Sequence, residues 1–184
     1  MKLVILDRDG VINHDSDAYI KSAEQWLPIA GSIEAIADLH RAGFTVTVAT
    51  NQSGLARKLF DLQQLQDMHR KMEDLVVAAG GQLAGIFYCP HGPEHGCDCR
   101  KPKPGLIDMI ARELQVSAAG AYLIGDSLRD LEAGVQRGCI PLLVRTGKGA
   151  KTLIQLAQQD NPALSSVAVF DDLAAVAHYL IEQN

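Results

Sequence analysis

Near the N-terminus the sequence reads KLVILDRDG over residues 2–10. The four apolar residues at positions 3–6 form a short run that is typical of a buried β-strand. Asp7 and Asp9 follow this run directly, so the predicted strand leads into two carboxylates that are two residues apart. In an open α/β sheet, ligands bind at the carboxyl ends of the strands. The stretch therefore predicts both a strand and a reactive loop at its end.

Similar apolar runs recur along the chain, and helical patterns separate them. The predicted strands are residues 2–6, 44–49, 83–88, 121–124, 140–144 and 167–170. Apolar residues between them recur at spacings of three and four, as in Ile33 and Ile36 or Met68 and Met72. Strands that alternate with helices predict a parallel sheet joined by right-handed crossovers. The expected fold class is α/β, with a doubly wound, mostly parallel sheet and helices on both faces.

The composition is that of one folded domain. The chain has 184 residues, 47% hydrophobic and 21% charged, so residues 1–184 are expected to form a single domain. Lys and Arg number 17 against 22 Asp and Glu, and the formal net charge of −5 disfavours a nucleic-acid or anionic-membrane partner. The apolar runs fall short of the roughly 20 residues of a membrane helix and the roughly 7–15 of a signal-peptide core. We therefore expect a cytoplasmic monomer.

Asp7 and Asp9 can divide the work of phosphate hydrolysis between them. A carboxylate that attacks phosphorus forms an aspartyl-phosphate and splits the reaction into two easier steps. A second carboxylate can protonate the leaving oxygen and then activate water. Calcium loops also contain two aspartates at this spacing, but they need further ligands before the glycine, and here Gly10 follows at once. Solvated loop acids are the remaining alternative for this motif taken alone.

Three later segments supply complementary chemistry. Residues 50–54 read TNQSG, and their hydroxyl and amide groups can donate hydrogen bonds to an oxyanion. Residues 125–130 read GDSLRD and bring more acid to the edge that carries Asp7, where carboxylates would hold magnesium. Residues 100–105 read RKPKPG and offer cations for phosphoryl oxygens. Together the segments predict a magnesium-dependent site for a phosphorylated small molecule.

In chain order, the patterns D-x-D-G, T-N, K-P-x-P and G-D-S-x-x-D resemble the four motifs of the haloacid dehalogenase-like phosphatases, across residues 7–130. The resemblance implies that Asp7 is the nucleophile and Asp9 the acid/base. It also implies that Thr50 binds the phosphoryl group and that Lys101 clamps its charge. Lys103 is a rival to Lys101, although the K-P-x-P pattern favours the lysine before the first proline.

The same resemblance implies the magnesium ligands. By position they are Asp7, Asp9 and Asp126, with Asp130 behind them. Some members carry Lys where Ser127 stands, and a Gly-aromatic pair where this chain has Lys58 and Leu59. These two departures concern the anomer preference and the detail of the pocket.

Residues 89–99 follow the pattern C-x-H-x₅-C-x-C, which can close a tetrahedral zinc site. The candidate ligands are Cys89, His91, Cys97 and Cys99. His95 is a fifth candidate, but a tetrahedron takes four ligands, so we interpret it as a solvated loop residue. Free buried cysteines are the alternative, although a loop rich in Pro, Gly and charge offers no apolar site for three thiols. The interpretation is a structural zinc that braces the cationic segment after it.

The zinc loop narrows the resemblance to the heptose-bisphosphate and histidinol-phosphate phosphatases, and residues 7–13 and 50–54 are most similar to the former. That family removes the 7-phosphate of D-glycero-D-manno-heptose 1,7-bisphosphate during heptose biosynthesis for surface polysaccharides such as lipopolysaccharide, and it lacks a large cap domain. No helical insertion fits between residues 10 and 31 or between 54 and 61. By position, the substrate side would be lined by Asp15, Tyr19, Asn51, Gln52, Ser53, Arg57 and Arg100.

Other functions stay open at this point. A histidinol-phosphate phosphatase or a polynucleotide 3′-phosphatase would share the catalytic motifs, although the net charge opposes the latter. A phospho-acceptor signalling domain also has a strand-end aspartate, but it gives no purpose to Asp9 or to the zinc loop. A zinc-binding interaction module is a further alternative. Residues 145–151 are interpreted as a surface turn without a role, and Trp26 as a loop anchor.

Overall fold

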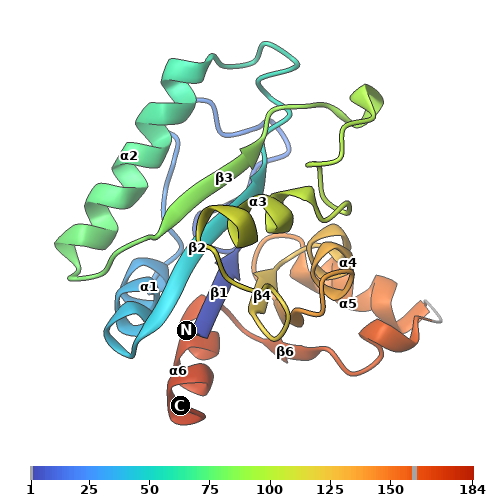
Figure 1. Ribbon diagram of the computed structural model, residues 1–184. Helices are drawn as coiled ribbons and strands as arrows, with labels where there is room; N and C mark the ends of the chain where they lie inside the picture. Colours follow the sequence, from blue (N-terminus) through green and yellow to red (C-terminus); the bar gives the residue numbers. More distant parts are fainter. Residues whose placement is uncertain (1, 159–160) are drawn as a thin grey trace.

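The structure, a computed structural model, describes residues 2–158 and 161–184. Six parallel strands form one sheet in the order β3-β2-β1-β4-β5-β6 (Figure 1). The strands are β1 (Lys2–Leu6), β2 (Phe44–Asn51), β3 (Gly85–Cys89), β4 (Tyr122–Gly125), β5 (Ile140–Val144) and β6 (Ala168–Phe170). The helices are α1 (Ser32–Arg41), α2 (Leu62–Ala78), α3 (Gly105–Glu113), α4 (Leu128–Val135), α5 (Gly149–Gln158) and α6 (Leu173–Glu182), with short 3-10 turns η1 (Pro93–His95) and η2 (Pro162–Leu164). The predicted doubly wound α/β fold is confirmed.

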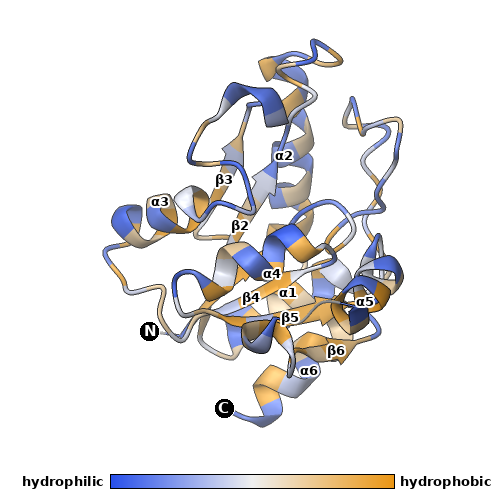
Figure 2. Ribbon diagram, turned by 90° about the vertical axis from the view of Figure 1, so that its right-hand side faces the viewer, coloured by the Kyte–Doolittle hydropathy of each residue, from blue (hydrophilic) through white to orange (hydrophobic). Residues whose placement is uncertain are grey.

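The central strand β1 is buried on both faces, because its apolar side chains alternate between two cores. Val4 and Leu6 pack with buried residues of α1, α2 and α6. Leu3 and Ile5 pack on the other face with residues of α3 and with Ala133 of α4. Figure 2 shows hydrophobic colour along β4, β5 and β6, with mixed colours on the helices around them. This two-sided burial explains why β1 reads as a continuous apolar run.

The sheet register brings the ends of several strands to one edge. Leu6 of β1 pairs with Val48 of β2 and with Ile124 of β4. The backbone N–H of Asp7 then donates to the carbonyl of Ile124 at 2.9 Å. The two chain ends lie together at the opposite edge, where the side chains of Lys2 and Asn184 are hydrogen-bonded (Figure 1). Every loop that follows a carboxyl end of β1, β2 or β4 therefore faces the same space.

The strand predictions differ from the structure mainly at their ends. The ranges 2–6 and 140–144 match β1 and β5, whereas the predicted strand 44–49 continues to Asn51. The extension arises because Thr50 and Asn51 still pair with Tyr88 and Cys89 of β3. The end of β2 is thus held against the start of the 89–99 loop. Among the described residues, no helix has the length and apolar character needed to cross a membrane.

The long connection between β1 and α1 forms no helix and no strand among its described residues, as expected for a chain without a large cap. Two isolated bridges, Asp9 with Asn13 and Asn13 with Pro28, fold it back on itself. Trp26 is fully buried in the core beside α2, which confirms its interpretation as an anchor. The second connection, between β2 and α2, ends at Asp61, which caps α2 through a reciprocal bond pair with Gln64.

Candidate active site and metal centres

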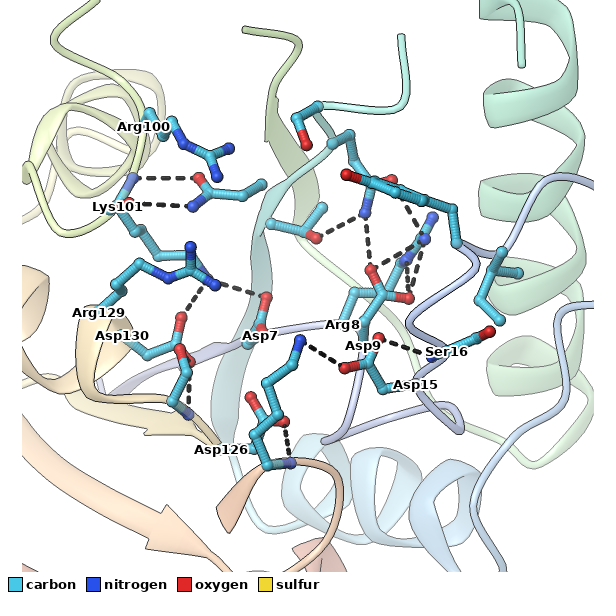
Figure 3. A pocket seen from close by; sticks show the side chains of 18 of the residues that line it. Asp7, Arg8, Asp9, Asp15, Ser16, Arg100, Lys101, Asp126, Arg129 and Asp130 are labelled. Carbon is cyan, nitrogen blue, oxygen red and sulfur yellow. Dashed lines mark hydrogen bonds and ion pairs between the residues drawn. The ribbon is translucent and has the colours of Figure 1, made fainter. Parts of the chain in front are cut away.

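A polar cavity of about 330 Å³ opens at the carboxyl ends of β1, β2 and β4 (Figure 3). The predicted catalytic, substrate-side and magnesium residues all line it: Asp7, Asp9, Asp15, Tyr19, Thr50, Asn51, Gln52, Ser53, Arg57, Arg100, Lys101 and Asp126. These residues come from the last two positions of β2, from the loops after β1, β2 and β4, and from the segment before α3. The fold thus brings together motifs that are up to 119 positions apart, from position 7 to position 126.

Asp7 lies at the end of β1, facing a buried lysine. The Nζ of Lys101 lies 2.8 Å from Asp7 Oδ1 and 2.6 Å from Asp130 Oδ1, and it donates to the carbonyl of Ala49 at 2.6 Å (Figure 3). Burial opposes its charge, but Asp130 and Asp7 hold the pKa of Lys101 above its usual value. Burial and the charge of Asp130 raise the pKa of Asp7 to about 7, against the opposing effect of Lys101. Lys101 is therefore a fixed cation beside the predicted nucleophile.

The backbone of Lys101 is held by the side chain of Asn51 at the end of β2. The side-chain amide of Asn51 donates to the carbonyl of Lys101 and accepts from its backbone N–H, both at 3.0 Å. Lys103, the rival cation, is half exposed and pairs instead with Asp98 at 3.0 Å. The geometry therefore favours Lys101 over Lys103 as the residue that clamps charge in the cavity.

A group of three carboxylates offers ligands for a hard cation. Oxygen atoms of Asp7, Asp126 and Asp130 lie within 4.8 Å of one another. Burial, followed by Asp130 and Asp7, raises the pKa of Asp126 to about 8. Asp130 is engaged on both oxygens, by Lys101 and by the N–H and Oγ of Ser127. This donor set fits magnesium, which prefers oxygen ligands, and leaves Asp7 and Asp126 as the best-placed side chains.

The side chain of Asp9 lies outside this group of carboxylates among the described residues, and its assignment as a magnesium ligand stays a prediction. Its carboxylate instead accepts hydrogen bonds from Arg8, Asn13 and Gln52 at 2.9–3.2 Å. Although burial favours the neutral form, Arg8 and the hydrogen bonds from Asn13, Arg8 and Gln52 hold the pKa of Asp9 below its usual value. Asp7 and Asp9 thus lie in opposite electrostatic environments, as two carboxylates with different tasks require.

The four predicted zinc ligands converge at the end of β3. The Sγ atoms of Cys89, Cys97 and Cys99 lie 3.1–3.7 Å from one another. The Nδ1 of His91 lies 3.6 Å from Cys89 Sγ and 3.4 Å from Cys99 Sγ. Tetrahedral zinc with bonds of about 2.3 Å would separate its sulfur ligands by about 3.8 Å. The arrangement is compatible with zinc, whereas the Nδ1 of His95 accepts from the N–H of Gly92 outside this group.

Two family models match the chain. The model described as HAD-hydrolase-like matches residues 98–176, and the model described as polynucleotide kinase 3 phosphatase matches residues 2–129. The first description names the haloacid dehalogenase-like hydrolases, and the second names a phosphatase. The second match covers all but Asp130 of the motifs that we predicted to be shared with polynucleotide 3′-phosphatases.

Curated relatives are more specific. The chain is 54% identical over 181 residues to the D-glycero-beta-D-manno-heptose-1,7-bisphosphate 7-phosphatase of Pseudomonas putida, covering 98% of this chain and 100% of that one. The enzyme of the same name from Bordetella bronchiseptica is 52% identical over 183 residues, covering 100% of this chain and 99% of that one. The chain belongs to this heptose-bisphosphate phosphatase family of haloacid dehalogenase-like enzymes.

Solved structures agree with this family assignment. The B. bronchiseptica D,D-heptose 1,7-bisphosphate phosphatase, solved with magnesium and phosphate, superposes with a TM-score of 0.93 at 53% identity, covering 100% of both chains. The Burkholderia thailandensis enzyme of that name gives a TM-score of 0.75 at 41% identity, covering 98% of this chain and 99% of that one. Family membership and the carboxylate group together support magnesium as a cofactor of this phosphatase.

The loop between β5 and α5 is a part of the phosphatase site that sequence analysis missed. Its Lys148 N–H donates to Asp126 Oδ2 at 2.7 Å, and the Oγ1 of Thr146 donates to the carbonyl of Gly10 at 2.6 Å. A Cβ on Gly147, whose φ is +55°, would lie 2.2 Å from Asp126 Oδ2. The prediction that residues 145–151 have no role is therefore wrong. The available signal was position, because this loop follows a strand end at the same edge of the sheet.

Cations and an aromatic ring form the outer wall of the phosphatase cavity. The Arg57 guanidinium lies over the Tyr19 ring, 5.8 Å from its centroid. Arg100 donates to the carbonyl of His91 at 3.3 Å and so links the thiol loop to the cavity. Lys148 Nζ lies 2.7 Å from Asp15 Oδ2, which joins the two loops on either side of the opening (Figure 3). The outer wall can therefore receive a second anionic group.

Proposed function

We propose that this phosphatase removes the 7-phosphate of D-glycero-β-D-manno-heptose 1,7-bisphosphate. The observation that carries the proposal is the identity of about half of all positions, over nearly the whole chain, to enzymes that bear this name. The cavity supports it, because a nucleophile, a buried clamp cation and outer arginines lie in one small polar space. The proposed product is heptose 1-phosphate, with inorganic phosphate as the second product.

In the first step, Asp7 attacks the phosphorus of the 7-phosphate, and the bond between phosphorus and the sugar oxygen breaks. Asp9 gives its proton to that sugar oxygen as it leaves. Lys101, fixed by Asp7, Asp130 and the Ala49 carbonyl, is placed to stabilise the negative charge of the transferring group. Thr50, buried at the end of β2, is the proposed hydroxyl donor to a phosphoryl oxygen.

In the second step, water attacks the aspartyl-phosphate, and the bond between phosphorus and Asp7 breaks. Asp9, now a carboxylate, takes the proton from that water and returns to its starting state. Magnesium, which Asp7 and Asp126 would hold, neutralises part of the charge that accumulates between Asp7 and an anionic substrate. The neighbours that lower the pKa of Asp9 keep it ionised in the free protein, so the proton that it donates in the first step is taken up when the anionic phosphate binds beside it.

Cations in the cavity that could bind the 1-phosphate support a bisphosphate as the substrate. Arg57 and Arg100 both line the cavity that holds Asp7. Charge-assisted bonds from these guanidinium groups to the non-reacting phosphate would orient the 7-phosphate toward Asp7. The proposed contacts on the sugar side are Asp15, Tyr19 and Ser53. The Tyr19 ring also makes a cation–π contact with Arg57.

Zinc is part of the proposal as a structural cofactor. The four ligands of the thiol cluster, Cys89, His91, Cys97 and Cys99, match the soft donor set that selects zinc, and they leave no open position for substrate. The zinc would hold the loop that delivers Arg100 and Lys101 to the cavity. Elemental analysis of the purified protein should find about one zinc per chain.

A substrate panel tests the proposal. Steady-state kinetics should favour the β-anomer of heptose 1,7-bisphosphate over histidinol phosphate and hexose monophosphates by at least about tenfold in kcat/KM. Phosphorus NMR should identify the 7-phosphate as the group released. Preference for histidinol phosphate, or for a 3′-phosphorylated oligonucleotide, would assign the chain to another activity of the superfamily.

We also propose that the phosphatase acts as a cytoplasmic monomer with no nucleic-acid or membrane partner. None of the four cysteines forms a disulfide, which suits a reducing compartment. Light scattering after size exclusion should give a mass close to one chain, and a dimer would contradict the proposal.

A further inference from the structure

The side chains of Arg8 and Gln52 lie behind the acid/base and share their hydrogen bonds with it. Arg8 is 1% exposed and Gln52 is 4% exposed, so both side chains lie in the wall of the cavity with very little solvent-accessible surface. The Nη2 of Arg8 lies 2.9 Å from Asp9 Oδ1, 3.0 Å from Asp9 Oδ2 and 3.2 Å from Gln52 Oε1 (Figure 3). A buried guanidinium is thus placed to hold the Asp9 carboxylate in one plane.

Gln52 connects this carboxylate to the phosphoryl-binding hydroxyl. Its Nε2 donates to Asp9 Oδ2 at 2.9 Å and to Thr50 Oγ1 at 2.8 Å, while its Oε1 accepts from Arg8. The side-chain amide therefore already has a partner for each of its two donors and for its acceptor. This use of the amide differs from the substrate contact that sequence analysis expected for Gln52.

We infer that Arg8 and Gln52 are positioning residues that aim the Asp9 carboxyl at the leaving oxygen and fix its distance from Thr50. The inference rests on the proposed phosphatase mechanism, in which Asp9 protonates the leaving group. Four hydrogen-bond donors approach Asp9 from three other side chains, counting Arg8 Nε and Nη2, Asn13 Nδ2 and Gln52 Nε2. These hydrogen bonds hold the Asp9 carboxyl group in a single orientation relative to the cavity. General acid catalysis depends on the alignment of the acid with the leaving oxygen.

The leaving group provides a test that separates positioning from a structural role. A sugar alkoxide leaves only with a proton from Asp9, whereas p-nitrophenolate leaves without one. The value of kcat/KM reports the steps up to phosphoryl transfer to Asp7, so the hydrolysis of the aspartyl-phosphate, common to both substrates, does not enter it. The ratio of kcat/KM for a sugar phosphate to that for p-nitrophenyl phosphate therefore measures acid assistance.

Two variants perturb the alignment without removing a catalytic group. Gln52→Met keeps the length of the side chain and removes its three hydrogen bonds, and Arg8→Lys keeps a cation beside Asp9 and loses the planar fork. In both variants kcat/KM for the sugar phosphate should fall by about 10²-fold, with a change of at most about threefold for p-nitrophenyl phosphate. Circular dichroism and zinc content check that each variant is folded.

Ser32→Ala is the matched control. In the wild type, the Oγ of Ser32 donates to the carbonyl of Ile12 at 2.6 Å. It therefore supports the loop after β1, which carries Asp9, without a hydrogen bond to Asp9 itself. It should leave the ratio between the two substrates unchanged. An equal fall on both substrates in Gln52→Met and Arg8→Lys, or no fall on either, would overturn the positioning role. A different result would contradict the proposed function. In that case, the wild-type protein would release no phosphate from any sugar phosphate.

Discussion

The carboxylates at the strand ends and the thiols of the 89–99 loop lie at the same edge of the sheet, but the chain assembles them by different means. The thiol cluster comes from eleven consecutive residues, and only Cys89 belongs to a strand. The carboxylate group joins Asp7 after β1 to Asp126 and Asp130 around the start of α4. The thiol ligands are close in space because they are close in the sequence. The carboxylates are brought together by the order and register of the strands.

The two centres also differ in charge and in their neighbours. Carboxylates of the strand-end group repel one another in a buried place, which is why the pKa values of Asp7 and Asp126 are raised to about 7 and about 8 by burial and by like charges. Lys101 offsets part of this repulsion. The thiol cluster has no such cation bound to its sulfur atoms among the described contacts. The comparison predicts that the first centre is tuned for reaction and the second for stability.

Asp7→Asn is expected to have the largest effect, and it should affect the carboxylate centre alone. Asp7→Asn removes the nucleophile and leaves the thiol loop untouched, because an amide is a poor nucleophile. Turnover of heptose 1,7-bisphosphate should fall by at least about 10⁴-fold. Zinc content and the circular dichroism spectrum should match those of the wild type. Near-normal phosphate release by this variant would remove the case for a covalent aspartyl-phosphate.

Damage to the thiol loop should produce the opposite pattern, with a marked loss of stability and a smaller loss of rate. Cys99→Ser should abolish zinc retention and lower Tm by about 10 °C, as expected when a structural zinc contributes several kcal/mol. Turnover should fall by about 10- to 100-fold, because the loop carries Lys101 to Asp7.

Cys139→Ala is the control for that variant, since Cys139 is a buried thiol bonded to the Ala118 carbonyl and lies outside the cluster. It should keep its zinc and its turnover. If Cys99→Ser keeps wild-type activity and Tm, the cluster is incidental to the fold.

The difference in construction also explains what the sequence could predict. The spacing of Cys89, His91 and Cys97 identifies a ligand set directly, because residues so close in the chain are close in space. The strand-end site was predictable because its motifs follow apolar runs, and parallel strands place such ends at one edge. The orientation of the Asp9 carboxylate was not predictable, since it depends on a hydrogen bond from Gln52, whose backbone N–H donates to the Cys89 carbonyl just beyond the paired part of β2 and β3. Lys148 was missed for a different reason, because no motif marks its loop and only its position after β5 indicated that it lies at the site.

Magnesium affinity should depend on pH. Asp7 and Asp126 have folded pKa values raised above the ordinary value of 3.8, so the metal-free protein loses stability as the pH rises through the range from about 4 to about 8. Magnesium must displace protons from these carboxyls below pH 7, and its affinity should fall by about tenfold per pH unit for each proton displaced. Titration calorimetry at pH 6, 7 and 8, in buffers of different ionisation enthalpy, would count the protons. A magnesium affinity that is flat between pH 6 and 8 would show that these carboxyls are already ionised in the free protein.

The smallest predicted effect concerns the loop that supports Asp126 from behind. Thr146→Val keeps the shape of the side chain and removes the 2.6 Å hydrogen bond from Thr146 Oγ1 to the Gly10 carbonyl. Gly10 and Gly147 enclose the Asp126 carboxylate so closely that a Cβ on either would lie about 2 Å from Asp126 Oδ2, so loosening this contact should shift a magnesium ligand. A net loss of about 1 kcal/mol corresponds to a Tm decrease of about 2–4 °C, and magnesium affinity should weaken by up to about fivefold.

Thr45→Val is the matched control, because Thr45 lies near the start of β2, at the other edge of the sheet, and its hydroxyl has no hydrogen-bond partner among the described contacts. It should change neither magnesium affinity nor zinc content. If Thr146→Val binds magnesium as tightly as Thr45→Val does, Asp126 is held by its own strand end and by the Lys148 N–H. The β5–α5 loop would then act on this centre through its backbone alone. A loss confined to Thr146→Val, with zinc retained, would show that the carboxylate centre depends on a loop distant in sequence and the thiol centre does not.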